Sequence, residues 1–248
     1  MTLARDAPTA PEVESSIALR SEIKLMDDAL EDSLQFIKSA PWTEFAKSPA
    51  VWSMTLAHAA NNWGLYNSLA WTPTFYAEQY GLNVKDSALL SVLPSVAGAV
   101  GGLIAGLTAD ALIRNLGENA DTTTTRKIYQ GIALFGPAVC LATLASHIPE
   151  QPWVAQTLLG LGLGLQAFNA AGYVAANQEK AGEKWTGLLY SITSLPGVMV
   201  GSFGVYLTGQ ILDVTQQDWS AVFGLTAVVN ALGATAFVLS YNSKREFD

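Results

Sequence analysis

Residues 152–176 read PWVAQTLLGLGLGLQAFNAAGYVAA, a run without a single charged side chain. A helix of about 20 mainly apolar residues is long enough to cross the roughly 30 Å hydrocarbon core of a bilayer. A helix of a soluble bundle would show a polar face, and this run has none. The stretch therefore predicts a membrane-spanning helix, and it favours a membrane protein over a soluble bundle.

Five further apolar runs, separated by short polar breaks, occur in the 248-residue chain, which is 50% apolar and only 14% charged. We predict an all-α membrane protein with six transmembrane helices that form one half of a larger helical bundle. The predicted spans are about 50–75, 87–113, 128–147, 153–176, 186–212 and 219–241, and residues 242–248 follow them as a tail.

The basic residues support this count, because Lys and Arg gather in cytoplasmic loops. Six spans place 12 of the 13 basic residues on one side of the membrane and leave Lys85 on the other. We therefore expect both termini on the cytoplasmic side, or on its organellar equivalent. We find no secretory signal in the N-terminal residues, and the sequence does not indicate in which membrane the protein lies. The net charge of −8 argues against a nucleic-acid partner, which would need clustered basic residues.

The first 49 residues form an acidic segment before the first span. Within it, residues 16–39 place apolar side chains three and four apart, which predicts an amphipathic helix. The members of its apolar stripe are Ile23, Met26, Leu30, Leu34 and Ile37. Two interpretations stay open: the helix lies along a membrane or a partner, or it is a solvated acidic linker that anionic lipid would repel.

Sequence motifs of enzymes and metal sites are missing. The chain contains no HExxH, GxSxG or Walker sequence, and Cys140 is its single cysteine, so it has neither an internal disulfide nor a cysteine zinc site. The glycines of residues 160–164 lie inside a span, without the preceding strand that a nucleotide-binding loop needs. We predict a protein that is not an enzyme and that has no cofactor and no bound metal.

Glycines four residues apart predict close packing between spans, because small residues let helix backbones approach each other in a membrane. Such spacing occurs at Gly98, Gly102 and Gly106, at Gly160 and Gly164, and at Gly197 and Gly201.

The first span carries polar residues that are costly in hydrocarbon. His58, Asn61 and Asn62 lie three and four apart and so share a helical face, and Tyr66 follows one turn later. That face should meet another helix or a water-filled cavity. For His58, contact with substrate or protons and an interhelical hydrogen bond are both open interpretations.

Residues 102–127, GLIAGLTADALIRNLGENADTTTTRK, resemble the loop signature of the major facilitator superfamily. The resemblance implies that an acidic residue at one helix end and the basic residues after it lock the cytoplasmic ends of neighbouring helices. Asp110, Arg114 and Arg126 or Lys127 would form this gate cluster, which breaks when the helices rock.

Four further segments resemble one branch of that superfamily, the anion:cation symporter family, which includes inorganic phosphate transporters, sialin and vesicular glutamate transporters. They are PWTEFAKSPAVWSMTLAHAANNWGLYNSLAWTPTFYAEQYGLNVKDSALLSVLP at 41–94, TRKIYQGIALFGPA at 125–138, AANQEKAG at 175–182 and WTGLLYSITSLPGVMVGSFG at 185–204. The resemblance implies alternating-access transport of inorganic phosphate or a related organic anion, with Na⁺ or H⁺ as a coupling ion.

The resemblance also implies where substrate binds. The substrate-contacting residues would be His58, Asn61, Asn62, Tyr66, Asn177 and Gln178. Asn61 stands where the family commonly has Arg or His, so a neutral amide replaces a full positive charge. Residues 177–185 likewise depart from the family pattern.

Only the second six-helix half of the family pattern is matched, and residues 1–49 resemble its central linker. Partners implied are the lipid bilayer, a small anion, and either a missing N-terminal half or a second copy of this chain. The alternative is a half-size or transport-inactive membrane protein that acts through dimerisation or through partners of its acidic segment.

Overall fold

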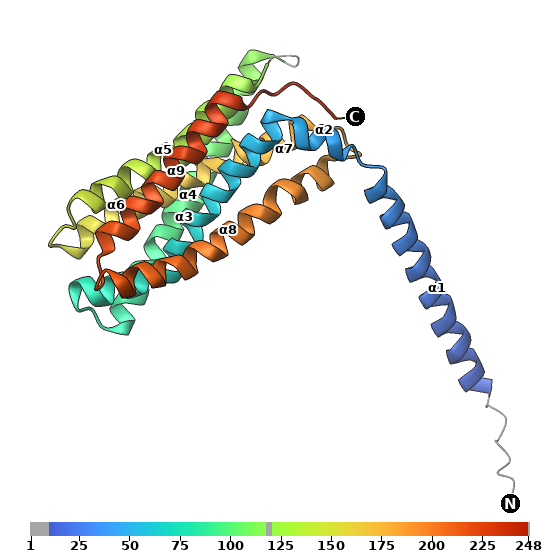
Figure 1. Ribbon diagram of the computed structural model, residues 1–248, viewed down its shortest axis with the longest axis horizontal. Coiled ribbons are helices and arrows are strands. Elements are labelled where there is room, and N and C mark those ends of the chain that lie inside the picture. Colours follow the sequence, from blue (N-terminus) through green and yellow to red (C-terminus); the bar gives the residue numbers. More distant parts are fainter. Residues whose placement is uncertain (1–9, 118–120, 248) are drawn as a thin grey trace, which may run out of the picture. The chain divides into compact units, whose positions relative to one another are not determined.

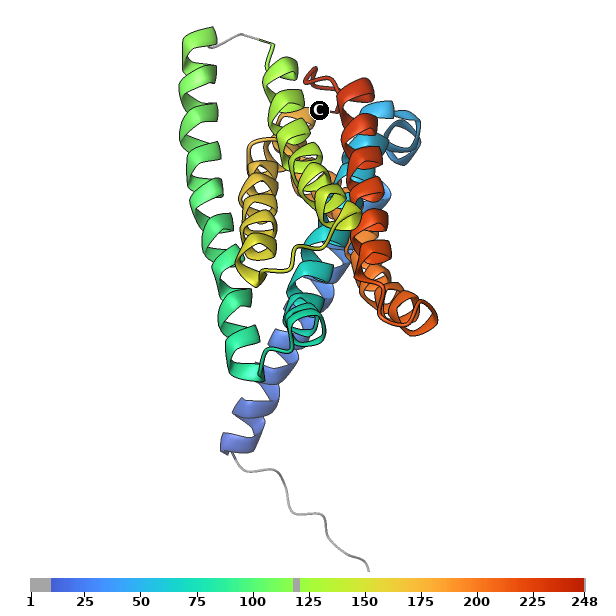
Figure 2. The ribbon, with the colours of Figure 1, turned by 90° about the vertical axis from the view of Figure 1, so that its left-hand side faces the viewer.

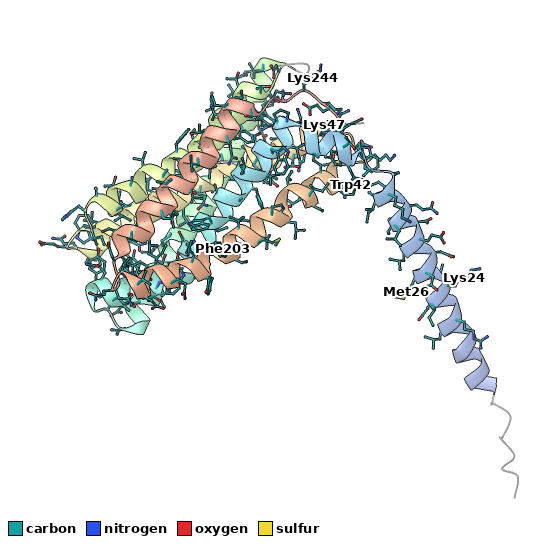
Figure 3. All side chains as sticks on the ribbon, viewed as in Figure 1. Lys24, Met26, Trp42, Lys47, Phe203 and Lys244 are labelled. Carbon is teal, nitrogen blue, oxygen red and sulfur yellow. The ribbon has the colours of Figure 1, made fainter. Side chains whose placement is uncertain are left out.

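The computed structural model describes residues 10–117 and 121–247, and the chain divides into two compact units, residues 1–42 and 43–248. In the first unit, helix α1 runs from Ala10 to Lys38, so it begins before the predicted amphipathic helix. Its apolar stripe is exposed, including Met26, which is labelled in Figure 3.

The second unit is a helical bundle (Figure 1). After the short α2, Trp42–Lys47, its helices are α3, Pro49–Tyr80; α4, Val84–Leu116; α5, Thr123–Ser146; α6, Pro152–Gln166; the 3₁₀ helix η1, Ala167–Ala170; α7, Tyr173–Lys180; α8, Thr186–Val214; and α9, Trp219–Ser240. The described part of the chain contains no β-strand beyond one isolated bridge between Ala181 and Phe247. The predicted all-α fold is confirmed.

Five helical segments are long and apolar enough to cross a membrane: Lys85–Leu116, Thr123–Ser146, Pro152–Lys180, Thr186–Val214 and Trp219–Ser240. The first predicted span, α3, has 32 residues but is absent from this set. Its length suffices for a crossing, and the polar side chains along it lower its hydropathy.

Local sequence sets the limits of α3. Ser48 caps its N-terminus by accepting a hydrogen bond from the backbone N–H of Val51, and Pro49 occupies the first turn, where a missing N–H costs nothing. Gly81 ends the helix with φ +65°, a left-handed conformation that glycine adopts without strain.

The helices pack in pairs around α3, which contacts α8 and α9, while α5 packs against α9 and α6 (Figure 1). Helix α4 lies at the edge of the bundle and packs on α6 (Figure 2). The outer surfaces of α4 and α8 expose large apolar side chains, such as Leu103 of α4 and Phe203 of α8, the second of which is labelled in Figure 3. Such surfaces are expected to face lipid or another helix.

Hydrogen bonds tie together the loops and helix ends that meet at each end of the bundle. At one end, the Tyr80 hydroxyl donates to the carbonyl of Pro149, and the indole of Trp219 donates to Glu78. At the other end, the Ser243 hydroxyl donates to Asp121. Lys47 and Lys244 also lie at this second end (Figure 3).

The backbones of α4 and α6 approach each other closely at two glycines. A Cβ added to Gly101 would lie 2.7 Å from the carbonyl carbon of Gly164. Gly106 faces open space, so the predicted packing row of α4 is wrong there. The tight row instead contains Gly101 and Ala97, whose carbonyl oxygen would lie 3.2 Å from a Cβ on Gly164. These two positions are one helical turn apart and therefore share a face.

The sequence predicts one membrane span over residues 153–176, but in the structure this segment is not one continuous helix. It is α6, η1 and the start of α7, and Gly172 before α7 has φ −88° and ψ −102°. Non-helical backbone at membrane depth needs partners for the freed polar groups. The break between η1 and α7 is therefore a candidate position for a functional site.

Candidate functional site

A cavity of about 390 Å³ that opens to the surface of the bundle lies beside this break, lined by residues of α3, α4, α6, η1 and α7. Four of its lining residues are polar, namely Asn61, Ser95, Gln166 and Asn169, and the others are apolar or glycine. None of the lining residues is titratable near neutral pH. The cavity wall supplied by this chain therefore offers hydrogen bonds without charge.

Asn61 is the predicted site residue that the structure places in the cavity wall. Its side chain is buried, and its Oδ1 atom has no hydrogen-bond partner. Its backbone carbonyl accepts a 2.7 Å hydrogen bond from Nε2 of Gln166, which ties α3 to α6 at the cavity. Oδ1 of Asn169 also lacks a partner. Buried polar atoms without partners are costly, which makes these two amides candidates for ligand contact.

His58 lies away from this cavity, between α3, α7 and α8. Its ring stacks on Tyr173 with centroids 4.5 Å apart, and its Nε2 is 3.1 Å from Nδ2 of Asn62. A Cβ added to Gly197 would lie 3.1 Å from the His58 Cγ, so this glycine makes room for the ring. The ring meets α7 by stacking, but its hydrogen bond to Asn62 lies within α3 and its Nδ1 has no partner, so both interpretations of His58 stay predictions.

The other predicted site residues lie on α3 and α7. Tyr66 packs on α8 at Gly201, where an added Cβ would lie 2.8 Å from its ring. Asn177 is wholly buried and accepts a hydrogen bond from Thr193, whose hydroxyl is 3.0 Å from that of Tyr173. Gln178 is exposed on α7. Of the predicted set, only Asn61 lines the cavity.

Three lining residues, Ser95, Gln166 and Asn169, were not predicted. Gln166 and Asn169 are amides inside the apolar run 152–176, which is the signal that could have found them. Ser95 has no comparable signal, because serine is common in membrane helices, where its hydroxyl can bond to its own backbone.

Two residues of α5 hold the break between η1 and α7. Arg126 donates a 2.8 Å hydrogen bond from Nη1 to the carbonyl of Ala171, and Oε1 of Gln130 accepts one of 2.7 Å from the N–H of Tyr173. Gly172 sits directly on α5, because an added Cβ would lie 2.8 Å from the backbone nitrogen of Gln130. The polar groups on both sides of the break are therefore satisfied by one face of α5.

Arg126 also forms an ion pair, and its partner lies outside the predicted gate cluster. The guanidinium lies against Glu179 of α7, with Nε 3.1 Å from both carboxylate oxygens. Asp110 and Arg114 are exposed, and within the described ranges neither they nor Lys127 form an ion pair. Arg126 thus bonds to an acid outside the predicted set, since the end of α7 lies beside the start of α5. A gate role for Asp110, Arg114 and Lys127 stays a prediction.

A second charged contact fixes the far end of α7. Lys180 is wholly buried, and its ammonium donates to Glu246 at 2.6 Å and to the carbonyls of Asn242 and Lys244. The Glu246 carboxylate also accepts a 2.6 Å hydrogen bond from the hydroxyl of Ser48, the cap of α3. We call residues 242–247 together with Lys180 and Ser48 the tail clamp.

The tail clamp should respond to acid. Burial by itself would raise the pKa of Glu246, but the hydrogen bonds from Lys180 and Ser48 and the Lys180 charge outweigh it and hold the pKa below its ordinary value. A lowered pKa stabilises the fold above the unfolded value, and this stability is lost as the pH falls through the folded value.

We therefore expect wild type to unfold at a higher temperature than Glu246→Gln, by a constant margin above about pH 5 that shrinks in more acidic solution. Thermal unfolding of the purified proteins between neutral and acidic pH measures this margin. A margin that grows as the pH falls would contradict the pairing.

No group of three or more His, Cys, Asp or Glu side chains gathers to hold a metal ion in the part of the chain that the structure describes. A coupling ion therefore stays a prediction from resemblance.

Comparison with known sequences gives these observations a context. The sequence profile of the Major Facilitator Superfamily matches residues 3–195. The chain is similar to Probable anion transporter 5, chloroplastic, of Oryza sativa subsp. japonica, with 35% identity over 93% of this chain and 47% of the relative.

Two further relatives have narrower names. Sodium-dependent phosphate transport protein 1, chloroplastic, of Arabidopsis thaliana is 30% identical over 100% of this chain and 46% of its own length. Human sialin is 30% identical over 85% of this chain and 42% of its own length.

The chain spans about half the length of these relatives. Two of them are named as an anion transporter and a phosphate transport protein, and these matches together with the apolar helices identify a multi-pass membrane protein. The matched profile covers most of the sequence, and the chain therefore belongs to the Major Facilitator Superfamily.

Proposed function

We propose that this chain is the C-terminal half of a secondary transporter that moves inorganic phosphate or a related organic anion by alternating access. The position of Asn61 carries the proposal, because a buried amide with an unpartnered oxygen lines a cavity between helices. The names of the relatives support anion transport, and the sequence offers no enzyme motif.

The second wall of the transport path would come from another six-helix half. The chain corresponds to about half of its relatives, and transporters of this architecture place substrate at the interface of two halves. That half is either the remainder of a longer chain or a second copy of this one. It has to supply positive charge for the anion, because the lining residues of this chain are neutral.

The amides of Asn61, Gln166 and Asn169 would then orient the anion. An amide donates hydrogen bonds from its NH₂ group to anion oxygens and accepts hydrogen bonds from hydroxyl groups of an organic substrate. Inorganic phosphate and a hydroxylated organic anion are therefore the two substrates to compare first.

A plastid membrane is the proposed location, because several relatives are named chloroplastic. The excess of basic residues on one side supports the proposal that both termini lie on the cytoplasmic side or on the equivalent side of an organelle.

Replacing Asn61 by leucine should lower the rate of anion uptake by at least about tenfold, because a lost hydrogen bond to a charged group is worth roughly 1.5–3 kcal/mol. Uptake of labelled phosphate and of a labelled hydroxylated organic acid into proteoliposomes that contain the purified full chain measures this. The matched control is Asn115→Leu, which changes an exposed amide on α4. Parallel assays with an imposed Na⁺ or H⁺ gradient test for a coupling ion.

Equal uptake by Asn61→Leu and wild type would contradict the site. If folded wild type takes up neither substrate in any gradient, this chain alone does not transport, and co-expression with a six-helix N-terminal half becomes the test between a half-transporter and an inactive protein.

A further inference from the structure

The ammonium group of Lys180 is the centre of a dense set of contacts that the proposed transport mechanism does not use. Four acceptors surround it: the carbonyls of Asn242 and Lys244, at 3.1 and 2.9 Å, and the side-chain oxygens of Asn242 and Glu246, at 2.9 and 2.6 Å. The side chain has no exposed surface. A buried lysine is stable only with such partners, since an unpaired buried charge costs several kcal/mol.

Backbone hydrogen bonds reinforce this contact. The N–H of Glu246 donates to the carbonyl of Lys180 at 3.0 Å, and the N–H of Gly182 donates to the carbonyl of Phe247 at 2.6 Å. The Phe247 ring is buried and meets Phe45 edge to face, with centroids 4.7 Å apart. Since Glu246 also bonds to Ser48, the tail joins the end of α7 to the start of α3.

Helix α7 is suited to move as a unit if this contact opens. It has eight residues, too few for a helix to be stable in isolation, and the break at Gly172 separates it from α6. Gln130 holds its first residue, and the tail clamp holds its last. Arg126 holds Ala171 just before the helix and pairs with Glu179 in its last turn. Helix α7 is thus fixed at its two ends by side chains rather than by continuous helix.

The same short helix contributes to the proposed site. Val174 lines the cavity, and Tyr173 stacks on His58. Asn177 receives a hydrogen bond from Thr193 of α8. A tilt of α7 would therefore change the cavity wall and the contacts of α3 and α8 together.

We propose that the tail clamp is a lock on α7 that regulates access to the cavity. With Lys180 paired to Glu246, α7 stays packed and Val174 is only partly exposed at the cavity wall. With the pair broken, Lys180 has to reach water, and α7 tilts at the cavity wall about the contacts that Arg126 keeps with Ala171 and Glu179. The clamp thus defines two discrete arrangements of one element, as a conformational switch requires. This inference rests on the proposed function, because the cavity is taken as the substrate site.

Cysteine labelling tests the lock without measuring transport. In a Cys140→Ala background, Val174→Cys reports on α7 and Ser95→Cys reports on the same cavity from α4. The full chain in proteoliposomes is labelled with a membrane-impermeant maleimide. We expect Glu246→Ala to raise the labelling rate of Val174→Cys about tenfold, a change equivalent to about 1.4 kcal/mol, and that of Ser95→Cys much less. Lys180→Met should act in the same direction.

Glu183→Ala is the matched control, because Glu183 is an exposed acid near the end of α7 and outside the clamp. It should change neither rate.

The lock is excluded if Glu246→Ala leaves the labelling rate of Val174→Cys unchanged, lowers it, or raises the labelling rates of both reporters equally, since the clamp would then only support the fold. If Lys180→Met fails to fold, Glu246→Ala still tests the lock, because the Glu246 side chain is partly exposed. Absence of anion uptake would contradict the proposed function but would leave the labelling result interpretable.

Discussion

Gly101→Ala is expected to destabilise the bundle by about 3 kcal/mol, the upper part of the range for overpacked sites. The new methyl group would lie 2.7 Å from the carbonyl carbon of Gly164 and within 3.0 Å of its Cα. Because these are backbone atoms, no side-chain rotation can relieve the contact, and α4 has to separate from α6. Reversible unfolding of the purified protein in mixed detergent and SDS measures the loss.

The control is Gly106→Ala, five residues further along α4, where nothing lies within 4 Å of the added methyl group. It should be neutral or slightly stabilising, since alanine favours helix more than glycine does. If both variants lose the same stability, then glycine flexibility in α4 matters and the contact with α6 does not.

Arg126→Met should cost about 3–5 kcal/mol, because it removes one partner of a mostly buried ion pair. The loss leaves the carbonyl of Ala171 without its side-chain donor, and it leaves the carboxylate of Glu179, which still accepts from the hydroxyl of Thr122, without its charged partner. Arg126→Lys should recover only part of the stability, since an ammonium group is compact and cannot reproduce the forked geometry of a guanidinium. Thermal unfolding and the yield of monodisperse protein measure these effects.

Lys127→Met is the adjacent control. Lys127 is partly exposed and forms no ion pair with a described residue, so its loss should change stability by less than about 1 kcal/mol. Similar losses for Arg126→Met and Lys127→Met would mean that positive charge at the start of α5, and not the contact with α7, is what stabilises the protein.

The sequence predicted the helical class because long uncharged runs have one stable form in a bilayer. It located the polar face of α3, but it did not predict that two rows of residues on this face contact different neighbours. In the structure, the row His58, Asn62 and Tyr66 meets α7 and α8, while the row Asn61, Leu65 and Leu69 lines the cavity. Each row follows a spacing of four residues, and which row meets which neighbour depends on tertiary packing that periodicity does not contain.

Long-range pairs explain the remaining differences. Arg126 and Glu179 are 53 residues apart, and Lys180 and Glu246 are 66 apart, so neither pair has a local sequence pattern. The break in residues 152–176 was equally hidden, because its polar groups are satisfied by Arg126 and Gln130 of another helix. A run of apolar residues indicates where a chain crosses a membrane, and its partners decide whether it crosses as one helix.

The uncharged lining of the cavity has a consequence for energetics. Asn61, Ser95, Gln166 and Asn169 keep the same charge at every physiological pH, so protonation cannot alter how this wall attracts an ion. Any dependence of substrate affinity on acidity must therefore arise on the opposing wall, in the substrate, or through movement of the helices, and the residues that line the cavity contribute a constant electrostatic background to those changes.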